Sequence, residues 1–344
     1  MNTTEKINAR KQRWAGFLDN KRRFVFLVHH GECGAPAALY HRHNRPKLLE
    51  HTRREYAKML ERLEWLDDDR VPCPNGMGVF TGTEIFAEAF GCRVHHPEDN
   101  MPFALPLVRT ASEAAKIKVP DWGATPLAGL LEDAVKLRAE FGGDCVLKLP
   151  DMQSAMDVCA LVWDKCELFP AMIEEPGAVK ELAAKVKALI FAFMDEWFRV
   201  LGKAFIAHFP DYYMPFGLTV SEDEIGAVSP DMFHEFFLPD LVEMSQRYGA
   251  LGIHCCAASR RQWDGFLKIP NLKILNLGPS GYTVNEAYEF FAPHLAQFHG
   301  CRVTLDPGSD LSHLPQGTRA VVEASAATRD DALRLAEKLA KLCG

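Results

Sequence analysis

Strand-like and helix-like segments alternate along the chain from about residue 127 onward, and this alternation limits the fold more than any other feature. Short apolar runs rich in β-branched residues are typical of buried strands, and the longer segments between them have helical periodicity. The runs span residues 144–149, 204–208, 216–220, 250–253, 272–277, 302–305 and 319–324. We expect one more strand within 70–110. The pattern therefore predicts an α/β fold built on parallel strands.

Strands and helices that alternate eight times are typical of the (β/α)8 barrel, or TIM barrel. A doubly wound open sheet is the alternative. Its dinucleotide-binding form has no support, because no Gly-x-Gly-x-x-Gly sequence follows an early strand. The length of 344 residues suits a single domain over 1–344. Within it we expect residues 1 to about 110 to form a helical and irregular N-terminal elaboration.

Composition and charge exclude several classes of partner. The net charge of -7 gives no basic surface for nucleic acid. The most apolar helical segment, about 178–201, contains Lys185, Lys187, Asp195 and Glu196, and such charges argue against a membrane span. The ten cysteines have no extracellular spacing pattern, and the polar N-terminus has no signal-peptide core. We therefore expect a cytoplasmic protein with reduced thiols and no nucleic-acid or membrane partner.

Polar and ionisable side chains gather where the predicted strands end. In a barrel these C-terminal strand ends meet at one face, which carries the active site. The alternative is an inert rim, since loops are polar in any case. We predict Glu222 and Asp223 as catalytic groups. The residues predicted to bind substrate are His29, His208, Tyr212, Tyr213, Asn276 and Asp306.

A possible metal site follows the predicted strand 250–253, which leads into His254, Cys255 and Cys256. If the strand stays extended, His254 and Cys256 point to one face and Cys255 points to the other. An imidazole and a thiolate on one face can bind the same Zn²⁺ ion. The alternative is an ordinary histidine beside two buried cysteines, because free cysteine is among the most buried residue types.

Three motifs in this part of the chain resemble the uroporphyrinogen decarboxylase superfamily. They are SEDEIG at 221–226, SPDMFHEFFLP at 229–239, and the HCC sequence at 254–256 that follows Gly249. Within the superfamily they are closest to the branch with cobalamin-dependent methyltransferases. The resemblance is strong over about residues 200–260 and continues more thinly over most of the rest. It implies a (β/α)8 barrel independently of the alternation.

The resemblance also implies a zinc site. In those methyltransferases the histidine and cysteine of the H-x-C motif bind zinc, and a distant cysteine after the last strand completes the site. The corresponding place here reads Glu323-Ala324-Ser325 and has no thiol. Zinc also accepts carboxylate ligands. We therefore expect Glu222 or Asp223 to serve as the third ligand beside His254 and Cys256.

The implied function is methyl transfer from a small methylated substrate, or from a methyl-corrinoid protein, to a thiol or another acceptor. A metal ion would lower the pKa of the acceptor and make it nucleophilic at neutral pH. The D-x-H-x-x-G pattern of corrinoid-binding domains is absent from the sequence. Any corrinoid is therefore expected only as a substrate carried by a partner protein.

Two other functions remain open. The decarboxylases of the superfamily share an N-terminal R-Q-A-G-R-Y stretch that holds substrate carboxylates. Residues 29–33 here read HHGEC and contain no paired arginines, and the acidic net charge suits a porphyrinogen with eight carboxylates poorly. A non-catalytic barrel that binds a ligand or a corrinoid partner is the third possibility, and the missing cysteine is compatible with it.

Overall fold

The computed structural model describes residues 1–31, 45–74, 82–98, 100–278, 280–294, 303–304, 311–312 and 314–343. The α-helices are α1 (Thr3–Leu18), α2 (Arg45–Arg62), α3 (Ile85–Ala89), α4 (Ala111–Ala114), α5 (Pro126–Phe141), α6 (Ala155–Val162), α7 (Lys165–Glu174), α8 (Pro176–Leu201), α9 (Pro230–Met232), α10 (Leu238–Tyr248), α11 (Trp263–Phe266), α12 (Val284–Phe291) and α13 (Arg329–Cys343). Short 3₁₀ turns are η4 (Trp122–Ala124), η5 (Glu224–Ala227) and η7 (Arg260–Gln262), and η6 (Phe233–Phe237) is a π-helix. The strands are β1 (Phe24–His29), β2 (Arg93–His95), β3 (Phe103–Leu105), β4 (Phe205–Ile206), β5 (Tyr213–Met214), β6 (Leu218–Ser221), β7 (Leu251–Cys255), β8 (Leu272–Leu277), β9 (Val303–Thr304) and β10 (Ala320–Ser325).

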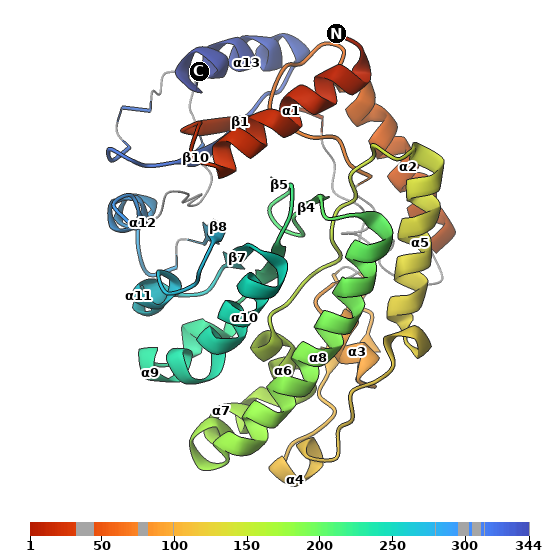
Figure 1. Cartoon of the computed structure of the whole chain (residues 1–344), viewed down its shortest axis with the longest axis vertical. Helices are drawn as coiled ribbons and strands as arrows, with labels where there is room; N and C mark the ends of the chain where they lie inside the picture. Colours follow the sequence, from red (N-terminus) through yellow and green to blue (C-terminus); the bar gives the residue numbers. More distant parts are fainter. Residues whose placement is uncertain are drawn as a thin grey trace.

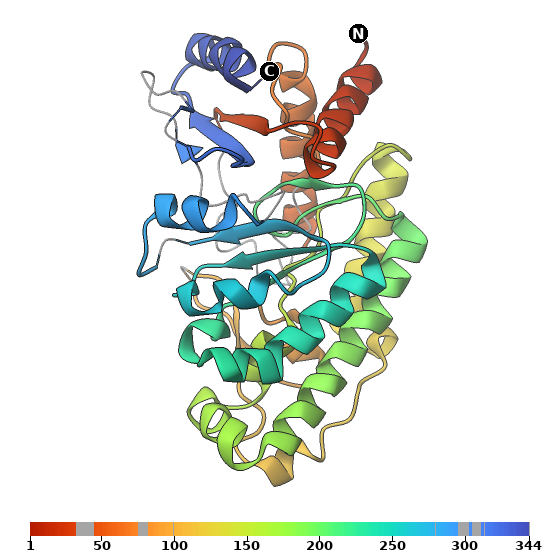
Figure 2. The ribbon, with the colours of Figure 1, turned by 60° about the vertical axis from the view of Figure 1, so that its left-hand side comes forward.

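The parallel strands form two three-stranded sheets. One has the order β6-β7-β8 and the other the order β1-β10-β9. In Figures 1 and 2 the second sheet lies with α1 and α13 at the end that also carries both chain termini, and β7 and β8 lie nearer the middle beside α10 and α11. The antiparallel pairs β2-β3 and β4-β5 are separate.

An extended segment at 147–154 joins β4 to β6. Leu149 N–H donates to the carbonyl of Ile206 at 2.9 Å, and Ser221 N–H donates to the carbonyl of Met152 at 2.8 Å. Single parallel bridges at these two places extend the strand order beyond the named sheets. The mixed α/β class is therefore confirmed. In the described residues the hydrogen-bonded sheets do not form one closed ring, so the eight-stranded barrel stays a prediction.

Most strands lie where the apolar runs predict them, and 272–277 matches β8 at both ends. Two predictions were wrong in detail. The run at 144–149 forms only a single parallel bridge to β4 and is not a full strand. In the described part of 70–110, β2 and β3 form an antiparallel hairpin apart from the parallel sheets. Apolar periodicity reports burial, but it does not report which segments exchange backbone hydrogen bonds.

Local capping explains the helix that precedes β7. Ser229 accepts a hydrogen bond from Met232 N–H at 3.2 Å, and Pro230 occupies the first helical position, where its missing N–H costs nothing. The helical stretch ends at Gly249, whose φ of 86° is left-handed and suits glycine. Pro170 lies inside α7, and the helix continues past it to Glu174.

Buried apolar side chains form one cluster that extends from Trp14 in α1 to Cys343 in α13. Tyr212 lies inside it, 1% exposed, and its ring packs against Trp14 with a centroid distance of 5.3 Å. Among the helices that the structure describes, none combines the length and the apolar character needed to cross a membrane.

Strands β6 and β8 approach β7 closely at Gly252, and a substitution there tests the fold. A Cβ atom at Gly252 in β7 would lie 2.7 Å from Cγ2 of Thr219 and 3.1 Å from Cβ of Ile274. We expect Gly252→Ala to destabilise the protein by about 1–3 kcal/mol, the usual cost of overpacking. Gly143→Ala is the control, because a Cβ there meets no heavy atom within 4 Å. Urea denaturation measures both variants, and equal stability would contradict this packing.

Candidate metal centre

The register of the β6-β7-β8 sheet places three polar residues in one row. Ser221 in β6 pairs with His254 in β7, and His254 pairs with Asn276 in β8. The His254 Nδ1 and Asn276 Oδ1 atoms are 2.7 Å apart. Because an amide oxygen can only accept, Nδ1 carries the proton and donates it. This tautomer leaves the lone pair on Nε2, the arrangement that orients a histidine for metal binding.

Asp223, His254 and Cys256 form a compact donor cluster. One ligand atom from each residue lies within 4.8 Å of the others. Cys256 N–H donates to Asp223 Oδ1 at 2.7 Å, and the Cys256 thiol donates to Asp223 Oδ2 at 3.3 Å. Cys255 is fully buried, as strand alternation predicts for the residue between two ligands. Oxygen, nitrogen and sulfur are all zinc ligands, so the donor set fits that ion.

The protonation states of this cluster follow from burial. Burial lowers the pKa of His254, an effect that the Asn276 hydrogen bond and the Asp223 charge partly oppose, so the ring is neutral at neutral pH. Burial, followed by the Asp223 charge, raises the pKa of the Cys256 thiol to about 11. A bound cation would reverse this preference and favour the thiolate, because metal binding displaces the thiol proton.

Glu222 occupies a different environment from Asp223, although the sequence offered both as the third ligand. Its side chain is 1% exposed and lies beside Asp157 in α6. Burial and the neighbouring Asp157 raise the pKa of Glu222 well above its usual range. The structure therefore brings Asp223 into the donor cluster with His254 and Cys256. The Glu222 side chain is buried beside Asp157 and is not part of that cluster. The catalytic role of either carboxyl group stays a prediction.

The residues predicted to bind substrate occupy separate places. Asn276 contacts His254, as described above. His208 is 6% exposed, and its ring nitrogens lie 3.1 Å from Thr219 Oγ1 and 2.9 Å from Ser221 Oγ. Tyr213 is buried in β5, which raises the pKa of its phenol. Asp306 lies outside the described residues.

His29 and Tyr212 both contact Glu323, and the three residues form a second polar cluster. Tyr212 donates its hydroxyl proton to Glu323 Oε1 at 2.8 Å, and His29 Nε2 lies 2.8 Å from Glu323 Oε2. Arg70 donates to His29 Nδ1 at 3.0 Å, so Nε2 carries the proton that Glu323 accepts. Glu323 was noted in sequence only as part of a strand end. This cluster links β1, β10 and the loop before β5.

Sequence analysis did not predict two residues near the donor cluster. Phe209 is 44% exposed, and its ring lies 4.5 Å from the ring of His254 in an edge-to-face contact. Lys148 is buried, helps to lower the pKa of His208 after the larger effect of burial, and donates to Asp211 at 2.5 Å. The only sequence signal for Phe209 is its place directly after the predicted strand 204–208, where loops commonly carry functional residues.

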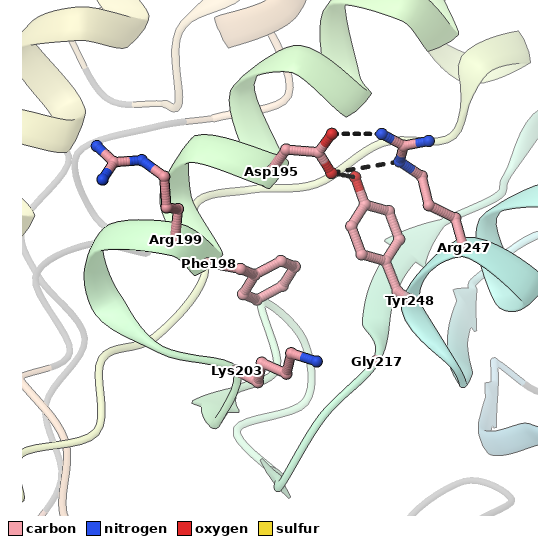
Figure 3. Close-up of a pocket in the computed structure, with 7 residues that line it drawn as sticks. All are labelled: Asp195, Phe198, Arg199, Lys203, Gly217, Arg247 and Tyr248. Carbon is pink, nitrogen blue, oxygen red and sulfur yellow. Dashed lines mark hydrogen bonds and ion pairs between the residues drawn. The ribbon is translucent and has the colours of Figure 1, made fainter.

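A separate pocket of about 530 Å³ lies between the C-terminal ends of α8 and α10 (Figure 3). Phe198 and Tyr248 form its aromatic walls, and Arg247 pairs with Asp195. Gly217, just before β6, also lines it, so the pocket lies at the opposite end of β6 from the donor cluster. Cations at helix C-termini complement the helix dipoles, which explains the charge here without a ligand.

Comparison with known proteins gives a structural match. A methyltransferase from Methanosarcina mazei has a similar structure, with a TM-score of 0.62, 11% sequence identity, and coverage of 96% of this chain and 99% of that protein. At this identity the match shows a shared fold. No protein-family profile matches the chain. No curated protein sequence matches it either.

The partly buried carboxyl group of Asp151 makes stability depend on pH. Burial is the main cause that raises its pKa to about 6, from an ordinary value of 3.8. The folded protein therefore holds this proton more tightly than the unfolded chain does. The cost of ionising the folded group is absent below pH 3.8 and complete above about pH 6.

We expect Asp151→Asn to gain stability relative to the unmodified protein as pH rises from about 4 to 7. The gain should reach at most about 3 kcal/mol, since one pKa unit corresponds to about 1.4 kcal/mol. Parallel urea denaturation of both proteins across this pH range measures the difference. A difference that stays constant with pH would show that Asp151 ionises normally.

Proposed function

We propose that this chain is a methyltransferase of the uroporphyrinogen decarboxylase-like class, with a (β/α)8 barrel and a zinc ion held by Asp223, His254 and Cys256. The observation that carries the proposal is the donor cluster at the ends of β6 and β7. The fold shared with a methyltransferase supports it. The corrinoid, if one takes part, would be a substrate on a partner protein, and a cytoplasmic location would keep the thiol reduced.

The residues in and around the cluster would have separate roles in such a site. Asn276 fixes the His254 ring so that Nε2 faces the cluster, and Asp223 holds the backbone of Cys256 in place. Zinc, when bound there, would supply Lewis acidity that lowers the pKa of an acceptor thiol. Phe209 would form an apolar wall beside His254 and exclude water from the acceptor sulfur. His208, buried and neutral, would keep the neighbouring strand end rigid.

Metal analysis and transfer assays test this function together. We expect the purified protein to contain close to one zinc per chain after dialysis against metal-free buffer. Methyl transfer should then be measured with methylamines, methoxylated aromatics and free methyl-corrinoid as donors and a thiol as acceptor. A zinc-replete sample without turnover, but with affinity for one of these compounds, would identify a binding protein and refute the enzyme.

Paired cysteine variants test the metal ligands. We expect Cys256→Ser to abolish zinc binding and activity, because it removes the thiolate of the cluster. Cys255→Ser should retain both and cost only packing, on the order of 1 kcal/mol. Inductively coupled plasma mass spectrometry measures the zinc content of each variant. Equal zinc loss in the two variants would contradict the assignment of Cys256, and full retention in Cys256→Ser would remove the site altogether.

A further inference from the structure

A buried carboxylate in α6 holds the loop that carries Asp223. Asp157 lies in the first turn of α6 and is 4% exposed. Its Oδ2 accepts the backbone N–H of Asp223 at 2.8 Å, and its Oδ1 accepts the backbone N–H of Glu224 at 3.0 Å. A carboxylate that accepts two consecutive backbone N–H groups fixes the path of the chain between them, as a charged side chain does at a helix N-cap.

The connection between α6 and β6 continues through the backbone. Ser154 N–H donates to the carbonyl of Ser221 at 2.9 Å, and the Ser154 hydroxyl accepts Asp157 N–H at 3.1 Å as the cap of α6. Lys165 in α7 forms an ion pair with Glu224. The end of β6, the loop at 222–224 and the start of α6 therefore form one hydrogen-bonded unit.

This hydrogen-bonded unit sets the position of Asp223, the third residue of the donor cluster. Asp223 belongs to no strand or helix, and its carboxylate receives the N–H and thiol of Cys256 from the next strand. Without Asp157, two partly buried N–H groups at 223 and 224 would lose their acceptor, which is destabilising. The loop would relax toward a conformation that satisfies them elsewhere, and Asp223 would move with it.

We propose that Asp157 is a positioning residue that holds Asp223 in the geometry required to bind a divalent metal ion with His254 and Cys256. The inference rests on the proposed function, because it assigns Asp157 to the support of that metal site. Asp157 is not one of the three residues of the donor cluster. It acts through the backbone of the loop at 222–224, which no short-range sequence pattern connects to α6.

Asp157→Asn tests the proposal, because asparagine has nearly the same shape but offers one acceptor oxygen in place of two. We expect the zinc affinity, measured by competition with a chromophoric chelator, to fall about 10- to 100-fold, the usual effect of losing a group that orients a metal ligand. In the Co²⁺-substituted protein the sulfur-to-metal charge-transfer band from Cys256 should remain while the ligand-field bands change. Backbone amide exchange should accelerate in peptides that contain residues 222–226.

Asp133→Asn is the matched control. Asp133 is also a buried helical carboxylate, 2% exposed, but it pairs with Arg45 and lies in α5. Its replacement should lower the free energy of unfolding and leave zinc affinity, the Co²⁺ spectrum and exchange at 222–226 unchanged. Equal zinc affinity in the Asp157→Asn and unmodified proteins would overturn the proposal, and so would equal losses in the Asp157 and Asp133 variants.

The amide exchange of the unmodified protein keeps the proposal testable even if Asp157→Asn does not fold. The Asp223 and Glu224 amides should exchange slowly for a loop, and rapid exchange would contradict their bonds to Asp157. This measurement also distinguishes the proposed function from the proposed role of Asp157. Absence of zinc binding by the unmodified protein would refute the proposed function, whereas slow exchange would still support the anchoring of the loop by Asp157.

Discussion

The parallel register of β6, β7 and β8 is the constraint on which the candidate site depends. Each rung of this ladder aligns one residue from each strand, so Ser221, His254 and Asn276 lie side by side. The ladder continues one residue further, because Glu222 N–H donates to the carbonyl of His254 at 2.9 Å. A slip of one residue would reverse the face of every side chain on the strand. The slip would turn His254 away from Asn276 and place the His254 side chain on the face where Cys255 is buried.

The β1-β10-β9 sheet is joined to the loop before β5 by polar contacts as well as by the apolar core. Tyr212 reaches from the loop before β5 to Glu323 in β10, and Glu323 also receives His29 from β1. Tyr212 and Glu323 are buried and His29 is half-buried, so each hydrogen bond satisfies an atom that would otherwise be costly to desolvate. The same contacts bring two of the predicted substrate residues together. Their location inside the fold makes a structural role for His29 and Tyr212 as well supported as a role in binding.

The sequence predicted those parts of the fold and site that depend on short stretches of chain. The bounds of β8 and the shared face of His254 and Cys256 both follow from neighbouring residues. Contacts between distant segments were not predictable in this way. Nothing near Asp157 in sequence indicates that its carboxylate binds the loop at 222–224, 66 residues away. The choice between Glu222 and Asp223 depends on that contact.

The donor cluster also explains how a site of this kind can lack a second cysteine. Two anionic ligands and one neutral histidine carry the same formal charge whether the second anion is a thiolate or a carboxylate. The cluster of Asp223, His254 and Cys256 would therefore neutralise a bound divalent cation as fully as two cysteines and a histidine would. The carboxylate of Asp223 differs from a second cysteine thiolate in its place in the fold and in its hardness as a ligand. His254 lies in β7, and Asp223 and Cys256 lie just after β6 and β7, so all three donors are at one edge of one sheet, whereas Ser325 pairs with His29 in the other sheet. A carboxylate is also a harder ligand than a thiolate, and it would leave a bound zinc ion more electrophilic toward an incoming thiol.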